Sequence, residues 1–307
     1  MTTWKYKDYK RWINDGCKIN NKVKILDLND RNLTTLSENI DNLINLRKLS
    51  CTYNKLTELP ETIGNLINLQ NLNCSENQLT ELPETIGNLI NLQYLDCSNN
   101  KLIGLPKTLG NLINLQILCC YRNKLTELPK TLGNLINLQY LWCNNNQLIK
   151  LPKTLGNLIN LQKLYCYNNK LAELPKTLDN LINLHVLLCE NNKLTKLPIS
   201  IIKLKHLEHI DYDKNIQLSI ILQRFIDRIK HKINNDVHNN FIQESLLNSI
   251  NILLSETITQ NINIVEDNIL DNKTKSIIYN FINDKTVGAL LINFEELLVY
   301  ILEKIDN

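Results

Sequence analysis

Hydrophobic and polar positions repeat along the chain with a period of 23 residues. The unit reads L-x-x-L-x-C-x-x-N-x-L-x-x-L-P-x-x-[IL]-x-N-L-x-N, and one complete copy runs from Leu69 to Asn91. Eight units extend from Val23 to His206, and a degenerate ninth begins at Leu207. A fixed period of this length is typical of solenoids, in which each repeat buries its apolar side chains only against its neighbours.

Within each unit the pattern changes from a strand to a turn. The apolar positions four and six, such as Leu72 and Cys74, alternate with outward positions three, five and seven, as in a β-strand. The asparagine at position nine has an amide that can donate and accept hydrogen bonds where the chain turns away. The proline at position fifteen suits the first position of a short outer helix, because no amide hydrogen is needed there. We therefore predict an α/β repeat solenoid with a parallel inner sheet.

These motifs resemble the leucine-rich repeat family, specifically the intracellular class with 23-residue units and a Leu-Pro pair in each unit. The near-identical Gly-Asn-Leu-Ile-Asn-Leu-Gln blocks resemble those of leucine-rich repeat proteins of giant amoeba-infecting DNA viruses. The resemblance implies a horseshoe fold, a role as a signalling scaffold or host-interaction factor, and a cytoplasmic location, in the host if the protein is viral.

The two ends of the chain differ from the repeats. We predict an N-terminal helical cap over residues 1–22, the solenoid over 23–218 and a C-terminal all-helical module over 219–307. A helix over residues 3–15 would end at Asn14-Asp15-Gly16 and place aromatic side chains on the first repeat. Apolar residues of the tail recur at helical spacing. Two such stripes are Leu222, Phe225, Ile226, Ile229 and Ile233, and Phe294, Leu297, Leu298, Ile301, Leu302 and Ile305.

The net charge, the lack of targeting signals and the cysteine pattern limit the classes of partner and site that we expect. The net charge of +3 gives no reason to expect nucleic acid as the main partner. No secretory signal and no apolar run of about 20 residues is visible, so we expect an intracellular protein without a membrane partner. Seven of the nine cysteines recur at position six, which predicts buried, reduced thiols rather than disulfides or a zinc site. Cys119 precedes an inward cysteine, so we expect it to face outward, where a reactive role stays open.

Known catalytic motifs are missing. The sequence has no P-loop, no G-x-G-x-x-G, no H-E-x-x-H and no G-x-S-x-G. A helical ubiquitin-ligase tail would need a cysteine nucleophile, and no cysteine follows Cys189. We therefore predict a non-catalytic protein with no cofactor, metal or small-molecule substrate. An enzyme hidden in the tail stays an alternative, and the neighbouring carboxylates Glu295 and Glu296 are where it would be tested.

Large rings gather at the outward strand positions from the fourth repeat onward. Exposed clusters of tyrosine and tryptophan mark binding surfaces, so we predict that a protein partner binds this concave face. The alternative is drift after duplication, because β-propensity also favours tyrosine and tryptophan in strands. The predicted partner-binding residues are Tyr94, Tyr121, Tyr140, Trp142, Tyr165 and Tyr167.

A row of lysines follows four successive prolines. The row consists of Lys107, Lys130, Lys153 and Lys176, and we interpret it as a solvated outer edge. A nucleic-acid binder that stacks bases on the rings and holds phosphates with these lysines is the alternative. The predicted positions count against this alternative, because the rings would lie on the concave face and the lysines on the outer edge.

Overall fold

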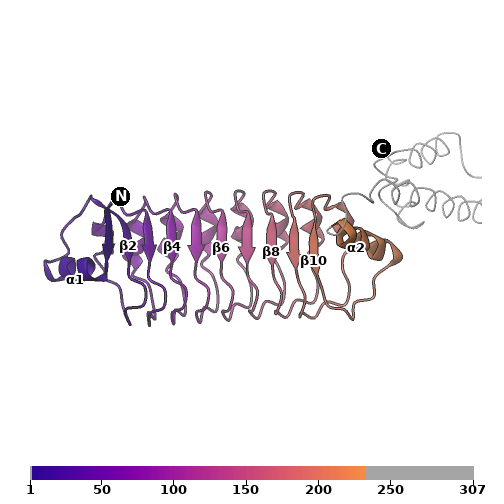
Figure 1. Cartoon of the computed structure of the whole chain (residues 1–307), viewed down its shortest axis with the longest axis horizontal. Helices are drawn as coiled ribbons and strands as arrows, with labels where there is room; N and C mark the ends of the chain where they lie inside the picture. Colours follow the sequence, from indigo (N-terminus) through magenta and orange to yellow (C-terminus); the bar gives the residue numbers. More distant parts are fainter. Residues whose placement is uncertain (1, 233–307) are drawn as a thin grey trace, which may run out of the picture. The chain divides into compact units, whose positions relative to one another are not determined.

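The 23-residue period produces one parallel sheet (Figure 1). The computed structural model describes residues 2–232. In this part of the chain ten strands lie side by side in the order of the sequence. They are β1 (Thr2–Lys5), β2 (Val23–Asp27), β3 (Lys48–Ser50), β4 (Asn71–Asn73), β5 (Tyr94–Asp96), β6 (Ile117–Cys119), β7 (Tyr140–Trp142), β8 (Lys163–Tyr165), β9 (Val186–Leu188) and β10 (His209–Asp211). The chain divides into two units, Met1–Gln217 and Leu218–Asn307, and all ten strands lie in the first.

Each strand from β2 onward pairs with its neighbour in a register of one repeat. Leu72 of β4, for example, lies beside Leu49 of β3 and Leu95 of β5. Equivalent positions therefore form continuous columns across the sheet, and the apolar positions of each unit are buried against those of the next. The parallel solenoid predicted from the repeat is confirmed.

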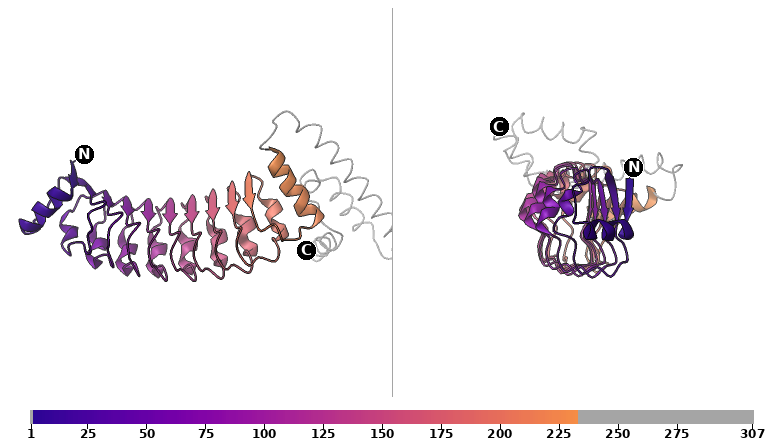
Figure 2. Two further views of the ribbon diagram at one scale, coloured as in Figure 1. Left: turned by 60° about the horizontal axis from the view of Figure 1, so that its bottom comes forward. Right: turned by 90° about the vertical axis from the view of Figure 1, so that its left-hand side faces the viewer.

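A short 3-10 turn follows each strand from β2 to β9, on the side of the solenoid opposite the sheet (Figure 2). The turns are η1 (Ile40–Asn42), η2 (Glu61–Asn65), η3 (Glu84–Asn88), η4 (Lys107–Asn111), η5 (Lys130–Asn134), η6 (Lys153–Asn157), η7 (Lys176–Asn180) and η8 (Ile199–Lys203). The prediction that proline takes the first turn position was wrong by one residue. Pro83, with φ of −61° and ψ of 144°, precedes η3, and its carbonyl accepts the first hydrogen bond of the turn from Ile86 at 3.0 Å. Proline fits there because its fixed φ matches an extended residue whose carbonyl alone is used.

The asparagine at position nine satisfies the backbone where the strand ends. The Nδ2 of Asn77 donates to the carbonyls of Cys51 at 2.9 Å, Cys74 at 3.2 Å and Ser75 at 3.0 Å. Its Oδ1 accepts the amide of Leu56 at 3.0 Å. The same pattern recurs in the later repeats, so this asparagine ladder stitches each repeat to the previous one, as its amide chemistry predicts.

In repeats two to six, successive turns pack too closely for a side chain at position nineteen. A Cβ added to Gly110 would lie 2.5 Å from the carbonyl oxygen of Thr131 in the next repeat. Thr131 in turn donates its hydroxyl to the carbonyl of Lys107 at 2.7 Å. Glycine is therefore required in these five repeats by the contact between neighbouring turns, whereas Asp41, Asp179 and Ile202 take this position in repeats one, seven and eight.

The N-terminal cap differs from the helix predicted over residues 3–15. Thr2–Lys5 form β1, which extends the sheet beyond β2, and the helix α1 covers Tyr6–Asn14. The edge of β2 offers unpaired backbone groups that an extended segment satisfies and a helix cannot. Tyr9 and Trp12 are buried as expected, and the hydroxyl of Tyr9 accepts the amide of Ser37 in the first repeat at 2.8 Å. Ile13 instead is exposed.

In the second unit the structure describes one helix, α2 (Ile220–Lys232). Its buried residues Leu222, Phe225, Ile226 and Ile229 follow the helical spacing seen in the sequence. The remaining predicted stripes, including the one from Phe294 to Ile305, lie outside the described residues. None of the helices in the described part is both long and apolar enough to cross a membrane.

Candidate functional site

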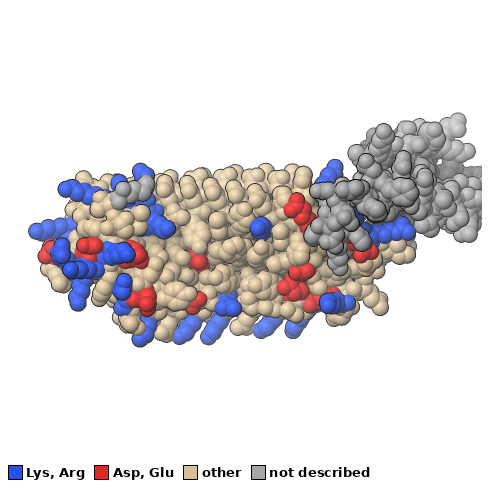
Figure 3. All heavy atoms as spheres, viewed as in Figure 1, with Lys and Arg blue, Asp and Glu red and all other residues tan. Residues whose placement is uncertain are grey.

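The six predicted partner-binding rings come from four neighbouring repeats. Tyr94, Tyr140, Trp142 and Tyr165 lie on strands β5, β7 and β8, whereas Tyr121 and Tyr167 lie two residues after the ends of β6 and β8. All six are half-buried on the solvent-facing side of the sheet. We call the surface formed by these six rings the concave aromatic face. Few charged side chains lie on the middle of the face formed by the sheet (Figure 3).

Two rings of this face stack on each other. Trp142 of β7 is paired with Tyr165 of β8, and the strand register stacks their rings with centroids 5.8 Å apart and planes 8° from parallel. The Nε1 of Trp142 is buried and donates no hydrogen bond to any described residue. The stack is thus a rigid apolar platform with one unused donor, and such aromatic anchors are typical of binding hot spots.

A second pair of side chains extends the platform toward the start of the strands. The Nζ of Lys163 lies 5.6 Å from the centroid of the Tyr140 ring, which is within cation–π range. The hydroxyl of Tyr140 and Oε1 of Gln162 are 3.3 Å apart. These contacts hold the Tyr140 ring in place before any partner binds.

Cys119 was predicted to face outward and to be available for reaction, and this prediction was wrong about its exposure. Its position on β6 is on the outward side, between Asp96 of β5 and Trp142 of β7. The neighbouring larger side chains nevertheless cover it completely. Burial, together with the nearby Asp96 carboxylate, raises the pKa of the Cys119 thiol well above its usual range, so little reactive thiolate forms.

Acidic residues lie beside the concave aromatic face, on strand β10 and two residues after the ends of strands β9 and β10. The pKa of Glu190 is raised, first by its burial and then by the neighbouring carboxylates of Asp211 and Asp213. Asp213 accepts the amides of Asn191 at 2.6 Å and Asn192 at 3.1 Å, which occupies both of its oxygens. This end of the sheet therefore favours cationic groups over anions.

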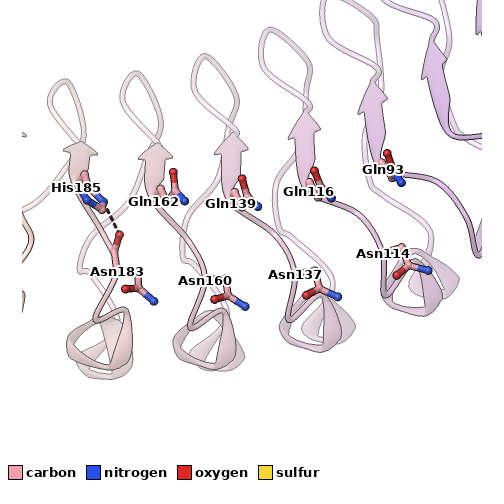
Figure 4. A pocket seen from close by; sticks show the side chains of 9 residues that line it. All are labelled: Gln93, Asn114, Gln116, Asn137, Gln139, Asn160, Gln162, Asn183 and His185. Atoms are coloured by element: carbon pink, nitrogen blue, oxygen red, sulfur yellow. Dashed lines mark hydrogen bonds between the residues drawn. The ribbon is translucent and has the colours of Figure 1, made fainter.

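A polar groove of about 600 Å³ lies beside the starts of the strands (Figure 4). In each repeat one asparagine follows the 3-10 turn, and one glutamine stands two residues later at the strand. The asparagines are fixed, since Nδ2 of Asn137 donates to the carbonyl of Ile113 at 2.8 Å and the others bond equivalently. Sequence reasoning missed this groove because its residues vary little between the repeats that line it, so the comparison of copies did not single them out. It is lined by Gln93, Asn114, Gln116, Asn137, Gln139, Asn160, Gln162, Asn183 and His185.

The cysteines at position six are buried, as predicted. Burial raises the pKa of Cys51 and of Cys143 to about 12, and that of the other five also rises. The thiol of Cys74 donates to the carbonyl of Asp96 at 3.4 Å, so the column also bridges neighbouring strands. All nine cysteines are free thiols. Within the described residues no cluster of histidine, cysteine or acidic side chains could hold a metal ion.

Comparisons with known proteins agree with this geometry. The family described as "Leucine-rich repeat region" matches residues 21–100 and 84–170. YopM, a leucine-rich effector protein from Yersinia pestis, is 32% identical with a TM-score of 0.56, and the match covers 69% of this chain and 53% of that chain. The comparison with curated proteins found no match.

Two further solved structures share the fold. The ectodomain of the membrane receptor kinase GASSHO1/SCHENGEN3 from Arabidopsis thaliana, in complex with CASPARIAN STRIP INTEGRITY FACTOR 2, is 29% identical with a TM-score of 0.59. The match covers 67% of this chain and 29% of that chain. The functional domain of InlJ from Listeria monocytogenes, which includes a cysteine ladder, is 25% identical with a TM-score of 0.53, covering 66% and 47%. The chain spans less than two thirds of the length of each of these three proteins. Its repeats, its asparagine ladder and these matches identify the chain as a leucine-rich repeat protein.

Proposed function

We propose that this protein is a non-catalytic interaction module that binds a protein partner through the concave aromatic face. The observation that carries the proposal is the stacked pair Trp142–Tyr165, half-buried on β7 and β8 in the C-terminal half of the sheet. Rings held in this way lose little conformational entropy when a partner covers them.

A protein partner fits this face better than nucleic acid does. The four lysines of the outer row begin the 3-10 turns η4 to η7, on the opposite side from the rings (Figure 2). One strand of nucleic acid cannot stack on the rings and reach those lysines together. At the end of the sheet, Glu190 and Asp211 add negative charge, which disfavours phosphates.

The nature of the partner follows from resemblance alone and is part of the proposal. The structure of GASSHO1/SCHENGEN3 in complex with a named factor supports protein binding by this fold. The similarity to intracellular Leu-Pro repeat proteins suggests a cytoplasmic signalling scaffold. If the protein is viral, its partner is a host protein.

Affinity capture from cell lysate, read by mass spectrometry, tests the proposal. The native protein is compared with a variant carrying Tyr140→Ala, Trp142→Ala and Tyr165→Ala. Each anchor should contribute about 2 kcal/mol to binding, so the triple variant should lose the partner entirely.

A matched variant controls for the loss of apolar surface. Ile103→Ala and Ile149→Ala remove exposed isoleucines that lie away from the strands, and they should leave capture unchanged. Both variants must first show the native circular dichroism spectrum and a cooperative unfolding transition. If the folded triple variant captures the same proteins as the native chain, the rings are not the binding site and the proposal fails.

A further inference from the structure

One isoleucine per repeat is exposed just after the 3-10 turn. These residues occupy position 22, two residues after the end of each 3-10 turn, and each is between 44% and 56% exposed. They line up because neighbouring repeats are in register. We call them the isoleucine row: Ile44, Ile67, Ile90, Ile113, Ile136, Ile159 and Ile182.

The isoleucine row is held rigidly by its backbone. The amide of Ile90 donates to the carbonyl of Asn88 at 2.8 Å, and the carbonyl of Ile90 accepts Nδ2 of Asn114 at 2.9 Å. The same two bonds recur around Ile113 and Ile136. A surface fixed in this way is preorganised for binding, because ordering it costs little entropy.

A second row, at position 16, changes sign along the solenoid. Its first three members are glutamates and its next four are lysines, and all seven are exposed. None of these seven side chains forms a salt bridge to another described residue. We call them the charged row: Glu38, Glu61, Glu84, Lys107, Lys130, Lys153 and Lys176. The charged row and the isoleucine row stand at the two ends of the same turns.

We propose that the occupant of this surface is a second copy of the chain, packed antiparallel about a two-fold axis between repeats three and four. The charged row reverses sign at that point, between Glu84 and Lys107. An antiparallel copy places Glu84 opposite Lys107, Glu61 opposite Lys130 and Glu38 opposite Lys153. Two-fold symmetry makes each of these pairs twice.

The charged row also favours this alignment of the two copies over alignments that are shifted by one or more repeats. Moving the copy by one repeat in either direction places Lys107 or Glu84 opposite itself on the axis. Like charges in contact disfavour those alternatives, so the identical repeats do not slip. Only the axis between repeats three and four pairs the charged row without a like-charge contact.

The available area fits an interface between two copies. Seven half-exposed isoleucines present on the order of 500 Å² of apolar surface, which is at the size where patches on single proteins become functional. Two such surfaces present about 1,000 Å² together, which is the lower limit for a specific interface, and the charged row and the flanking asparagines add to this area. In this register Ile90 faces Ile113, and Ile67 faces Ile136.

Sedimentation velocity over a range of protein concentrations tests the dimer with a charge-exchange cycle. Glu61→Lys and Lys130→Glu should each raise the dimer Kd by about tenfold or more, because each places two pairs of like charges together. Combining the two substitutions should return the Kd to within about threefold of the native value. Lys124→Glu, the same charge change at an exposed position outside both rows, is the matched control and should leave the Kd unchanged.

Disulfide trapping checks the orientation independently. A mixture of Ile67→Cys and Ile136→Cys proteins should cross-link, while either variant alone should not, because identical residues lie about 14 Å apart in the antiparallel pair. The native cysteines are buried and do not compete. A monomer at about 10 µM and above, cross-linking by Ile67→Cys alone, or single and double charge variants of equal Kd would each overturn the proposal. The concave triple variant should dimerise normally, so this inference and the proposed function fail separately.

Discussion

Replacing Asn123 by alanine tests whether the asparagine ladder stabilises the solenoid. The Nδ2 of Asn123 donates to three carbonyls, those of Cys97, Cys120 and Tyr121, at 3.0 to 3.3 Å. Its Oδ1 accepts the amide of Leu102 at 3.0 Å. The side chain is almost fully buried, so water cannot replace these bonds without opening the turn.

The four lost bonds are not equal. The carbonyl of Cys97 still accepts Asn100, that of Cys120 still accepts Asn146, and that of Tyr121 still accepts a backbone amide. Each of these three losses therefore costs only about 0.5 kcal/mol, at the low end for a hydrogen bond. The amide of Leu102 has no other acceptor among the described residues, and burying it unpaired costs about 1–3 kcal/mol. The free energy of unfolding should fall by about 2.5–4.5 kcal/mol in total.

Urea unfolding followed by circular dichroism measures this loss as a lower transition midpoint with an unchanged m-value. Asn137→Ala is the matched control, because this exposed asparagine makes a single bond, to the carbonyl of Ile113, and should cost no more than about 1 kcal/mol. Equal losses in the two variants, or a loss below about 1 kcal/mol for Asn123→Ala, would refute the account of the ladder.

Three further predictions concern the turns, the thiols and the cap. Gly110→Ala should lower the free energy of unfolding by about 2 kcal/mol in urea titration, since its Cβ would collide with the backbone of Thr131; a neutral effect would contradict the close packing. Cys119 should resist iodoacetamide at pH 8 in the folded protein and react only in urea, as peptide mapping would reveal; labelling of the native chain would contradict its burial. Burial raises the pKa of Tyr9 to about 12, so its neutral form contributes stability that is complete below pH 10 and lost as the pH rises through about 12. Tyr9→Phe should reduce that alkaline loss in thermal melts, while costing about 1 kcal/mol at neutral pH through the bond to Ser37; an identical alkaline profile would contradict the assignment.

The repeat predicts the fold well because one residue type at one spacing has one physical role. Leu72 and its equivalents must be buried in every copy, and Asn77 must satisfy the turn in every copy, so seven copies report the same constraint. The N-terminal segment offers no such repetition. The aromatic residues of a single helix-like stretch could not reveal that Thr2–Lys5 instead complete the edge of β2.

Exposure on the sheet was harder to predict than position. The alternation along β6 correctly places Cys119 on the outward side, but whether an outward side chain is exposed depends on the size of its neighbours on β5 and β7. Those neighbours are 23 residues away in sequence, and a cysteine between Asp96 and Trp142 is covered by them. The alternation along one strand therefore shows which side chains point outward, but it does not show whether they are exposed.

The repeats differ from one another mainly at the outward strand positions and at position 16, which belong to the two proposed surfaces. At most buried positions the copies are held alike by packing, because a change of volume or polarity leaves a cavity or an unpaired polar group in a column shared with both neighbours. Buried position 18 changes only between isoleucine and leucine, as from Ile86 to Leu109, which keeps the side-chain volume. At the outward strand positions and at position 16 no such constraint acts, and there the copies differ in a spatially ordered way. The rings collect on β5 to β8 and the charge changes sign once, between Glu84 and Lys107. Independent changes at unconstrained sites would scatter both features along the chain, so their grouping on two opposite sides of one rigid solenoid argues that each side meets a surface of its own.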